Sequence, residues 1–301
     1  MTVGELDATG ALARLKGAGL TFKVGPYAIR ARTDLPDVAA GLRFLYSQFP
    51  LLDGDHIVDA ELHIRTKPFL PRRVSIAVDG EVQFDWLPRR VVVPMAEWAL
   101  NVCVFHRSHQ YFMLHAAVVE RGGQAALCVG RAGSGKSTLC AGLVHRGWRL
   151  LSDEVALIRP ADLAIQPVPR PVSLKEESIA IIQEWAPQAQ FGPVWPQTSK
   201  GRVAHMLPTP DSVARAEETA LPRWLIFPRY DRDAPTTLAP VPKARAFIQA
   251  ADNSFNYSVL GRPAFETLVR VIDRCDCFDL RFGDLPSAIR ETTSLAAAEG
   301  L

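Results

Sequence analysis

The sequence predicts an α/β fold: a core with a mixed β-sheet built around a glycine-rich loop, preceded by a small α+β unit. Three observations predict it. The 301 residues are 48% hydrophobic, enough to bury one large core or two ordinary ones. Apolar and polar residues alternate in several stretches before residue 110, as in strands. An apolar run, AALCV, then leads directly into GRAGSGKST at 130–138. We therefore predict an N-terminal unit over residues 1–110 and a larger domain over residues 111–301.

The N-terminal unit contains four local patterns. The stretch LTFKVGPYAIRART alternates like two strands joined at a Gly-Pro turn, and DLPDVAAGLRFLYSQFP predicts a helix that ends before Pro50. RVSIAVDGEVQFDWL alternates on both sides of Asp79-Gly80, a dipeptide typical of tight hairpins. Residues 93–110 follow as an amphipathic helix with Pro94 at an early position.

From residue 112 the pattern becomes strand, loop, helix, strand. MLHAAVVERGGQAALCVG predicts two strands joined by Arg-Gly-Gly, LCAGLVHRG a helix stopped at Gly147, and WRLLSDEVALIRP one strand ended by Pro160. After Pro160 the chain is rich in proline, which favours loops over a site rather than regular sheet. LPRWLIFPRY and CFDLRFGD predict two further strands, and KARAFIQAADNSFNYSVL and RPAFETLVRVIDRC predict helices.

Composition excludes several classes of protein. The net charge of +2, without a run of basic residues, argues against nucleic acid and membrane surfaces as partners. The longest apolar stretch, Val91–Phe105, contains Glu97 and a proline and is too short to span a bilayer. Five cysteines lack the spacing of a zinc site and fit a reduced compartment. MTVGELDATG carries early charge and no apolar core, so we expect no secretory signal and a cytoplasmic location.

The glycine-rich stretch satisfies the P-loop pattern G-x-x-x-x-G-K-[ST] in full, with a predicted strand before it and a helix after it. Glycines let backbone N–H groups turn toward phosphate oxygens, together with the helix N-terminus. Lys136 adds a point charge for the β- and γ-phosphates, and the Ser137 hydroxyl is placed to ligate Mg²⁺. The predicted nucleotide-binding residues are Gly130, Arg131, Ala132, Gly133, Ser134, Gly135, Lys136, Ser137 and Thr138.

Two adjacent acids, Asp153 and Glu154, follow the loop by one helix and stand among apolar residues. At a strand tip that faces the loop, one carboxylate can hold the metal while the other takes a proton from an attacking hydroxyl. An ordinary acidic pair at the end of a strand is the alternative. The chain has neither the LSGGQ-like signature of ABC transporters nor an NKxD motif for guanine recognition.

These motifs resemble one family. The chain is similar to the C-terminal catalytic domain of HPr kinase/phosphorylase, most specifically over residues 114–158. The similarity rests on three stretches: the strand HAAVV from His115, the P-loop, and HRGWRLLSDEV. Trp148 occupies a position where the family motif has His, and Glu154 one where the family usually has Asp. PVPKARAFIQAADNSFNY resembles a later family stretch more faintly. The whole chain looks more like the divergent HPr-kinase-related proteins found in peptide-modification gene clusters.

The resemblance implies roles for three residues. Asp153 corresponds to the general base and Glu154 to the Mg²⁺ ligand, and His115 would lie near the acceptor. The resemblance also implies a homo-oligomer. From the residues alone, a histidine within a strand is more often part of the core; with the resemblance, a role near the acceptor is an equal alternative.

The sequence adds weaker candidates. Cations in the proline-rich region could neutralise charge on the transferring phosphoryl group, or could be solvated surface residues: Arg170, Lys175, Lys200 and Arg202. Arg229 follows a predicted buried strand and could point toward the nucleotide. Trp148 and Trp195 could stack on a base, but packing is the stronger interpretation.

Taken together, the motifs predict an ATP- and Mg²⁺-dependent kinase that phosphorylates a hydroxyl, with serine on a peptide or small protein as the expected acceptor. Lys136, His115 and Asp153 are its predicted catalytic residues, and Ser137 and Glu154 its metal ligands. Two alternatives stay open: a kinase of a small metabolite with the same site, and a nucleotide-binding regulatory or scaffold protein that hydrolyses ATP slowly.

Overall fold

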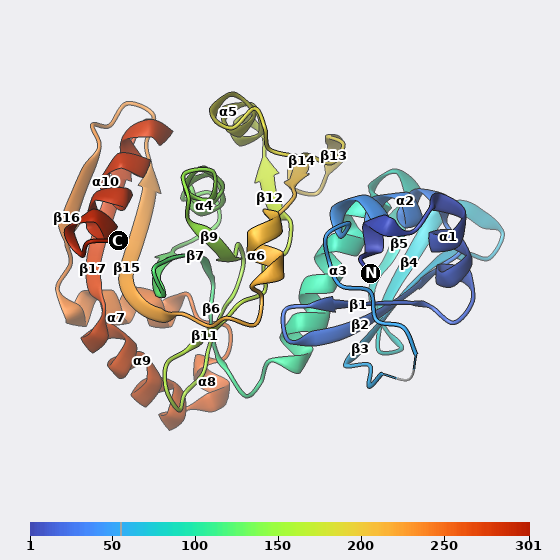
Figure 1. Ribbon diagram of the computed structural model, residues 1–301, viewed down its shortest axis with the longest axis horizontal. Helices are drawn as coiled ribbons and strands as arrows, with labels where there is room; N and C mark the ends of the chain where they lie inside the picture. The colour runs from blue at the N-terminus through green and yellow to red at the C-terminus, as the bar shows by residue number, and fades with distance from the viewer. Residues whose placement is uncertain (55) are drawn as a thin grey trace. The chain divides into compact units, whose positions relative to one another are not determined.

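The computed structural model describes residues 1–54 and 56–301, which form an α/β protein with mixed sheets of parallel and antiparallel strands. The chain divides into two compact units. The first consists of Met1–Ser108, Ser173–Ile179 and Gln190–Leu207. The second consists of His109–Val172, Ala180–Ala189 and Pro208–Leu301. Figure 1 follows the chain through both units by colour. Two segments of the proline-rich region, which we predicted as part of the second domain, thus belong to the first unit.

A five-stranded sheet, in the order β1-β2-β3-β4-β5, forms the centre of the first unit. Only β2 and β3 are parallel neighbours; the other pairs are antiparallel. The predicted hairpin is confirmed, since both turn residues have the positive φ that such a turn requires, 51° at Asp79 and 84° at Gly80. The strands are β1 (Leu20–Val24), β2 (Tyr27–Thr33), β3 (Ala60–Lys67), β4 (Leu70–Val78) and β5 (Glu81–Pro88).

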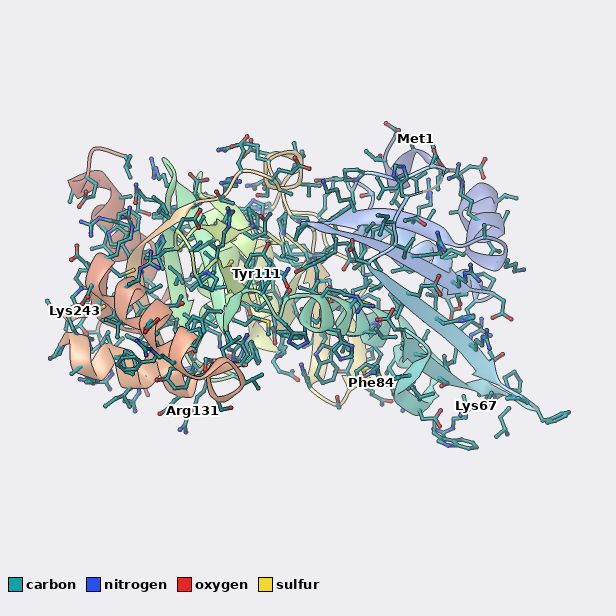
Figure 2. The ribbon with its side chains drawn as sticks, turned by 90° about the horizontal axis from the view of Figure 1, so that it is seen from below. Met1, Lys67, Phe84, Tyr111, Arg131 and Lys243 are labelled. Carbon is teal, nitrogen blue, oxygen red and sulfur yellow. The ribbon has the colours of Figure 1, made fainter. Side chains whose placement is uncertain are left out.

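Helices cover the apolar face of this sheet. Alternate residues of β2 are buried, which is the period expected of a strand with one face on a core. Two predicted helices are confirmed as α2 (Pro36–Leu45) and α3 (Val92–Arg107), whereas α1 (Ala8–Lys16), capped by Asp7, was not predicted. Short 3₁₀ helices are η1 (Val3–Glu5) and η2 (Arg89–Val91). Lys67 marks the projecting end of the β3–β4 pair in Figure 2.

The region after Pro160 is more regular than its proline content predicts. It contains α5 (Glu177–Trp185) and a three-stranded sheet in the order β12-β14-β13. The strands are β12 (Val172–Lys175), β13 (Trp195–Thr198) and β14 (Gly201–Met206). Gly201, with φ of 79°, closes the turn between β13 and β14, and the last four residues of β14 are buried. The sheet tolerates the high proline content because most of the prolines lie outside the strands or at their ends.

The second unit is built on a six-stranded sheet in the order β16-β17-β15-β8-β7-β9. β8, β15 and β17 are mutually parallel; β7 runs antiparallel to both β8 and β9, so β9 points the same way as β8. The strands are β7 (Ala116–Arg121), β8 (Gln124–Val129), β9 (Arg149–Ser152), β15 (Leu221–Tyr230), β16 (Thr237–Pro240) and β17 (Asp276–Phe282).

Helices flank this sheet. One core joins the strands to α7 and α9, through residues such as Leu127, Leu225 and Leu268. α4 packs against α10 and β7, and Figure 1 shows α10 alongside β17. The helices are α4 (Lys136–Val144), α6 (Pro210–Ala214), α7 (Lys243–Asp252), α8 (Tyr257–Leu260), α9 (Arg262–Arg274) and α10 (Leu285–Ala298). α10, capped by Asp284, was not predicted.

Two strands predicted as continuous are broken. The first is interrupted at His115, between β6 (Phe112–Leu114) and β7. The second is interrupted between β9 and β10 (Ala156–Ile158), where Asp153 and Glu154 lie. β10 pairs with β6 on one side and with β11 (Ile165–Gln166) on the other, in a separate three-stranded sheet. Apolar residues continue across both breaks because both sheets contribute to one core.

Candidate functional site

The predicted site residues of the second unit gather at one edge of the six-stranded sheet. Parallel strands end at the same edge, so the glycine-rich loop after β8 and the acids after β9 share it. Val129, the last residue of β8, pairs with Ala116, while Ser152, the last of β9, pairs with Val118. The two strand ends therefore flank the start of β7, about 10 Å apart at the backbone for two interstrand spacings. Ligands of open α/β sheets bind at this carboxyl edge.

The loop from Gly130 to Gly135 turns the chain from β8 into α4. Gly133 and Gly135 have φ of 84° and 96°, values that side chains with a Cβ rarely adopt. The Lys136 side chain is 6% exposed, and its Nζ donates to the carbonyl oxygens of Gly130 (2.5 Å) and Arg131 (3.0 Å). The ammonium group is thus held across the mouth of the loop by the loop's own backbone. Figure 2 labels Arg131 in this loop.

Aromatic residues from the neighbouring parallel strands support the loop. The backbone N–H of Tyr230, at the end of β15, donates to the Ser134 carbonyl (3.1 Å). A Cβ at Gly135 would lie 2.8 Å from Cζ of Phe282, the last residue of β17. The rings of Tyr230 and Phe282 contact each other, with centroids 5.7 Å apart. Glycine is therefore required at 135 both by the backbone conformation and by this close approach.

Beside the loop, two antiparallel ladders are interrupted at the same place. Leu114 pairs with Ala156 in one ladder, and Val118 pairs with Ser152 in the other. Between these pairs, residues 115–117 lie opposite residues 153–155. The interruption brings His115 Nε2 to 3.8 Å from Glu154 Oε1, and both side chains are partly exposed. The structure thus places together two residues that lie 39 positions apart in the sequence.

Ser152 orders the acidic turn. Its hydroxyl oxygen accepts from the backbone N–H groups of Glu154 (3.4 Å) and Val155 (3.2 Å). A serine before such a turn satisfies donors that the broken ladder leaves without a backbone partner. Glu154 remains partly exposed, whereas Asp153 is buried, with 8% of its surface exposed. The two adjacent acids therefore occupy different environments.

Lys136 and Asp153 act electrostatically on the same thiol. Burial raises the pKa of Cys128, in β8, to about 12; Lys136 acts to lower this pKa and Asp153 to raise it. Burial also raises the pKa of Cys140, in α4, and Asp153 contributes to that rise. Coulombic effects of this kind decline with distance. The cation of the loop and the carboxylate after β9 are therefore both near enough to Cys128 to influence its pKa.

Asn256 and its neighbours hold the strand that leads to His115. The Asn256 side chain accepts from the Met113 N–H (3.0 Å) and donates to the Tyr111 carbonyl (2.8 Å). The His115 N–H donates to the Asn253 carbonyl (2.7 Å), and its ring lies 5.4 Å from that of Phe255. Asn256 is 3% exposed, so its side chain has a structural role in holding this segment.

The weaker candidates divide between the two units. Lys175, Lys200 and Arg202 belong to the first unit, where Lys200 Nζ lies 3.7 Å from the centroid of the Trp98 ring. Arg170 belongs to the second unit and is buried; near it, the Val168 N–H donates to the Leu151 carbonyl of β9 (2.7 Å). The chain at Arg170 therefore runs close to the acidic turn.

The structure also places Arg229 and the two tryptophans. Arg229 is exposed near the carboxyl end of β15, at the same sheet edge as the loop. Trp148 is buried and packs edge-on against Trp224, which confirms the packing interpretation. Trp195, in the first unit, contacts His205. The neighbour of Trp148 in the sequence, Arg149, has a structural role as well, since it forms a buried ion pair with Glu120 (2.5 Å).

Ser137 and Glu154 are the residues of this site that could hold a magnesium ion. Among residues 1–54 and 56–301, no group of three or more His, Cys, Asp or Glu side chains could hold a metal by itself. Mg²⁺ in phosphoryl-transfer sites is usually held by one or two protein oxygens, phosphates and waters. Ser137, in the first turn of α4, and Glu154 are oxygen donors at the same sheet edge. Two protein oxygens are as many as a magnesium site of this kind usually has.

Sequence reasoning missed the residues that support the loop. Tyr230 and Phe282 were not singled out, although each ends a strand of apolar residues. The signal was the pairing of an aromatic residue with a strand end in both IFPRY and LRFGD. Asn256 was not singled out either, because its hydrogen bonds to Met113 and Tyr111 could not be inferred without the fold.

Comparison with known proteins adds no assignment. No protein-family model matches the chain, and no curated protein matches it. Over the described part of the chain, the helices are too short or too polar to cross a lipid bilayer.

Proposed function

We propose that this chain is an ATP- and Mg²⁺-dependent kinase that transfers the γ-phosphoryl group to a serine hydroxyl of a peptide or small protein. One observation carries the proposal: the glycine-rich loop with Lys136 and the Asp153–Glu154 turn share one edge of the six-stranded sheet. Nucleotide hydrolysis or transfer needs a phosphate-binding loop, but transfer to a hydroxyl also needs a proton acceptor beside it.

Each residue of the site has a distinct role in this proposal. The loop amides and the Lys136 ammonium hold the β- and γ-phosphates, and the N-terminus of α4 adds its positive end. Mg²⁺, held by the Ser137 hydroxyl and the Glu154 carboxylate, would neutralise charge on the phosphates. The acceptor hydroxyl binds in the interruption between His115 and the acidic turn. Asp153 takes the proton of that hydroxyl as its oxygen attacks in line.

The arrangement of elements supports a P-loop core of the HPr kinase type. A histidine precedes β7, the loop follows β8, and two acids follow β9, in the order that the family resemblance implies. The interrupted ladder supplies what a simple nucleotide-binding loop lacks, a place for a second substrate beside the γ-phosphate. This feature favours a kinase over a slow hydrolase or scaffold protein.

Nucleotide binding is tested first, by isothermal titration of MgATP into the purified chain. Lys136→Ala should weaken binding by ten- to a hundredfold, since hydrogen bonds to charged groups contribute about 1.5–3 kcal/mol. Lys67→Ala is the matched control: it removes the same charge from an ion pair with Asp85 in the first unit and should leave MgATP affinity unchanged. Equal affinity in the Lys136 variant and the parent chain would remove the phosphate-binding role of the loop.

Phosphoryl transfer is tested with γ-labelled ATP and the peptides encoded beside this chain's own gene. Asp153→Asn keeps the shape of the side chain, so MgATP affinity should persist while transfer falls by about 10²–10⁴-fold. Asp273→Asn, an exposed change in α9, is the control and should transfer normally. Label on a metabolite instead of a peptide would identify a small-molecule kinase. Release of phosphate without any labelled acceptor would identify a hydrolase and refute the kinase proposal.

A further inference from the structure

The first unit contains a pocket of about 410 Å³ at the carboxyl ends of its two parallel strands. It lies among the end of α1, the end of β2 and the end of β3. Its volume falls within the range of small-molecule sites. The lining residues are Leu15, Lys16, Gly17, Arg32, Thr33, Asp34, His63, Ile64, Arg65 and Thr66.

Positive charge accumulates at this pocket because of strand register. Arg30 pairs with Glu61 across β2 and β3, and their side chains form an ion pair of 3.2 Å. Two residues further along, Arg32 pairs with His63 instead, and Arg65 follows. Across the described residues, no carboxylate lies within ion-pair distance of Lys16, Arg32 or Arg65. Three cations therefore face one acid of the lining, Asp34, whose side chain is exposed.

Arg32 carries a buried donor that needs an acceptor. Its Nε is buried and finds no acceptor among residues 1–54 and 56–301. The stem of the side chain packs closely over Gly19, where a Cβ would lie 3.2 Å from Arg32 Cγ. A guanidinium stays charged, and a buried charged donor without an acceptor is costly. An anion in the pocket would satisfy this donor.

The other polar groups of the pocket are arranged compatibly. Arg65 Nε donates to His63 Nε2 (2.8 Å), and burial, with Arg65 and Arg32 nearby, lowers the pKa of His63. A neutral His63 that accepts at Nε2 carries its proton on Nδ1 and is a further donor. At the end of α1, the carbonyls of Ala13 and Arg14 already accept from the N–H groups of Gly17 and Gly19. The N–H groups of Gly17 and Gly19 are therefore used within this turn, and side chains supply the donors to the pocket.

We infer that this pocket binds the oxyanion group of a small organic ligand, a phosphate or a carboxylate, through Arg32, Arg65 and Lys16. The planar fork of arginine matches both groups with two parallel hydrogen bonds. This inference does not depend on the proposed kinase function, because every lining residue belongs to the first unit and the glycine-rich loop to the second.

The test is an isothermal titration at low ionic strength with two probes, inorganic phosphate and citrate, and sodium chloride as the reference. Lys136→Ala is the parent in every titration, so that phosphate bound at the glycine-rich loop does not contribute. We expect saturable binding of at least one probe. Phosphate alone would indicate a phosphate-bearing ligand, and citrate alone a carboxylate.

Arg32→Gln should weaken that binding at least about tenfold, since charged hydrogen bonds of this kind contribute about 1.5–3 kcal/mol. Arg90→Gln removes the same charge from an exposed residue outside the pocket lining and should leave binding unchanged. If circular dichroism shows that Arg32→Gln is unfolded, the exposed change Lys16→Gln replaces it, with an expected loss of at least threefold. No saturable binding of either probe, or binding that the pocket variant does not weaken, would overturn the inference.

Discussion

Gly135 offers the sharpest test of the loop geometry, because two separate effects oppose a side chain there. Its φ of 96° is a conformation in which an alanine costs about 1–2 kcal/mol. The added Cβ would also lie 2.8 Å from Phe282 Cζ and 3.4 Å from Tyr230 Cβ. Phe282 is buried and packed against Tyr230, so it has little room to move. Overpacking of this kind costs a further 1–3 kcal/mol, roughly.

Gly133 is the matched control. Its φ of 84° is similarly unfavourable for alanine, but a Cβ there would meet no atom within 4 Å. Gly133→Ala should therefore lower the free energy of unfolding by about 1–2 kcal/mol, and Gly135→Ala by about 2–5 kcal/mol. Urea unfolding followed by circular dichroism measures both values. Equal losses in the two variants would show that Phe282 does not contact the loop at 135.

A double-mutant cycle separates the clash from the backbone strain. Phe282→Leu removes the Cζ atom that Gly135→Ala would meet. The double variant should then lose less stability than the sum of the two single variants, by about 1 kcal/mol or more, because the clash is shared by both changes. Strict additivity would leave backbone strain as the sole cost of a side chain at 135 and contradict the contact.

Three further predictions concern buried side chains. All five cysteines are buried, and burial raises the pKa of Cys128 and Cys275 to about 12, so the native thiols should resist a thiolate-selective reagent at pH 8 and react once the chain is unfolded in urea. Glu120→Ala should lower the free energy of unfolding by about 3–5 kcal/mol, because it leaves the buried Arg149 guanidinium without its carboxylate; urea unfolding measures the loss. Asn256→Ala should destabilise by about 1–3 kcal/mol, since the Met113 N–H loses its acceptor, and hydrogen exchange at Met113 should quicken.

Local sequence signals predicted the regular elements well. Asp79-Gly80 identified its hairpin because a two-residue turn with positive φ strongly restricts residue type. Gly147, with φ of 88°, marked the end of the helix that follows the loop for a similar reason. α10 was missed although Asp284 caps it, because its alanine-rich end gives no clear apolar period. The four strands of the proline-rich region, β11 to β14, were missed because their pairing is set by distant residues.

Local sequence predicted one part of the candidate site better than the other. The strand, loop and helix around the glycine-rich motif could be predicted, since its eight residues are contiguous and chemically specific. The acidic pair could be predicted as residues but not as a turn, because the apolar flanks of WRLLSDEVALI describe one continuous strand equally well. Whether Leu151 and Ala156 lie in the same strand depends on which partner each pairs with, β7 or β6. That choice is made by tertiary structure.

The direction of β7 explains why His115, the glycine-rich loop and the acidic pair lie at the same sheet edge. Between two strands that run one way, an antiparallel strand presents its amino end where its neighbours present their carboxyl ends. His115, just before β7, is thereby placed at the edge where β8 ends in the loop and β9 ends in the acids. If β7 ran parallel to β8, the same residues would put His115 at the opposite edge, away from both. The chemistry proposed for this chain therefore depends on one antiparallel strand as much as on the glycine-rich motif itself.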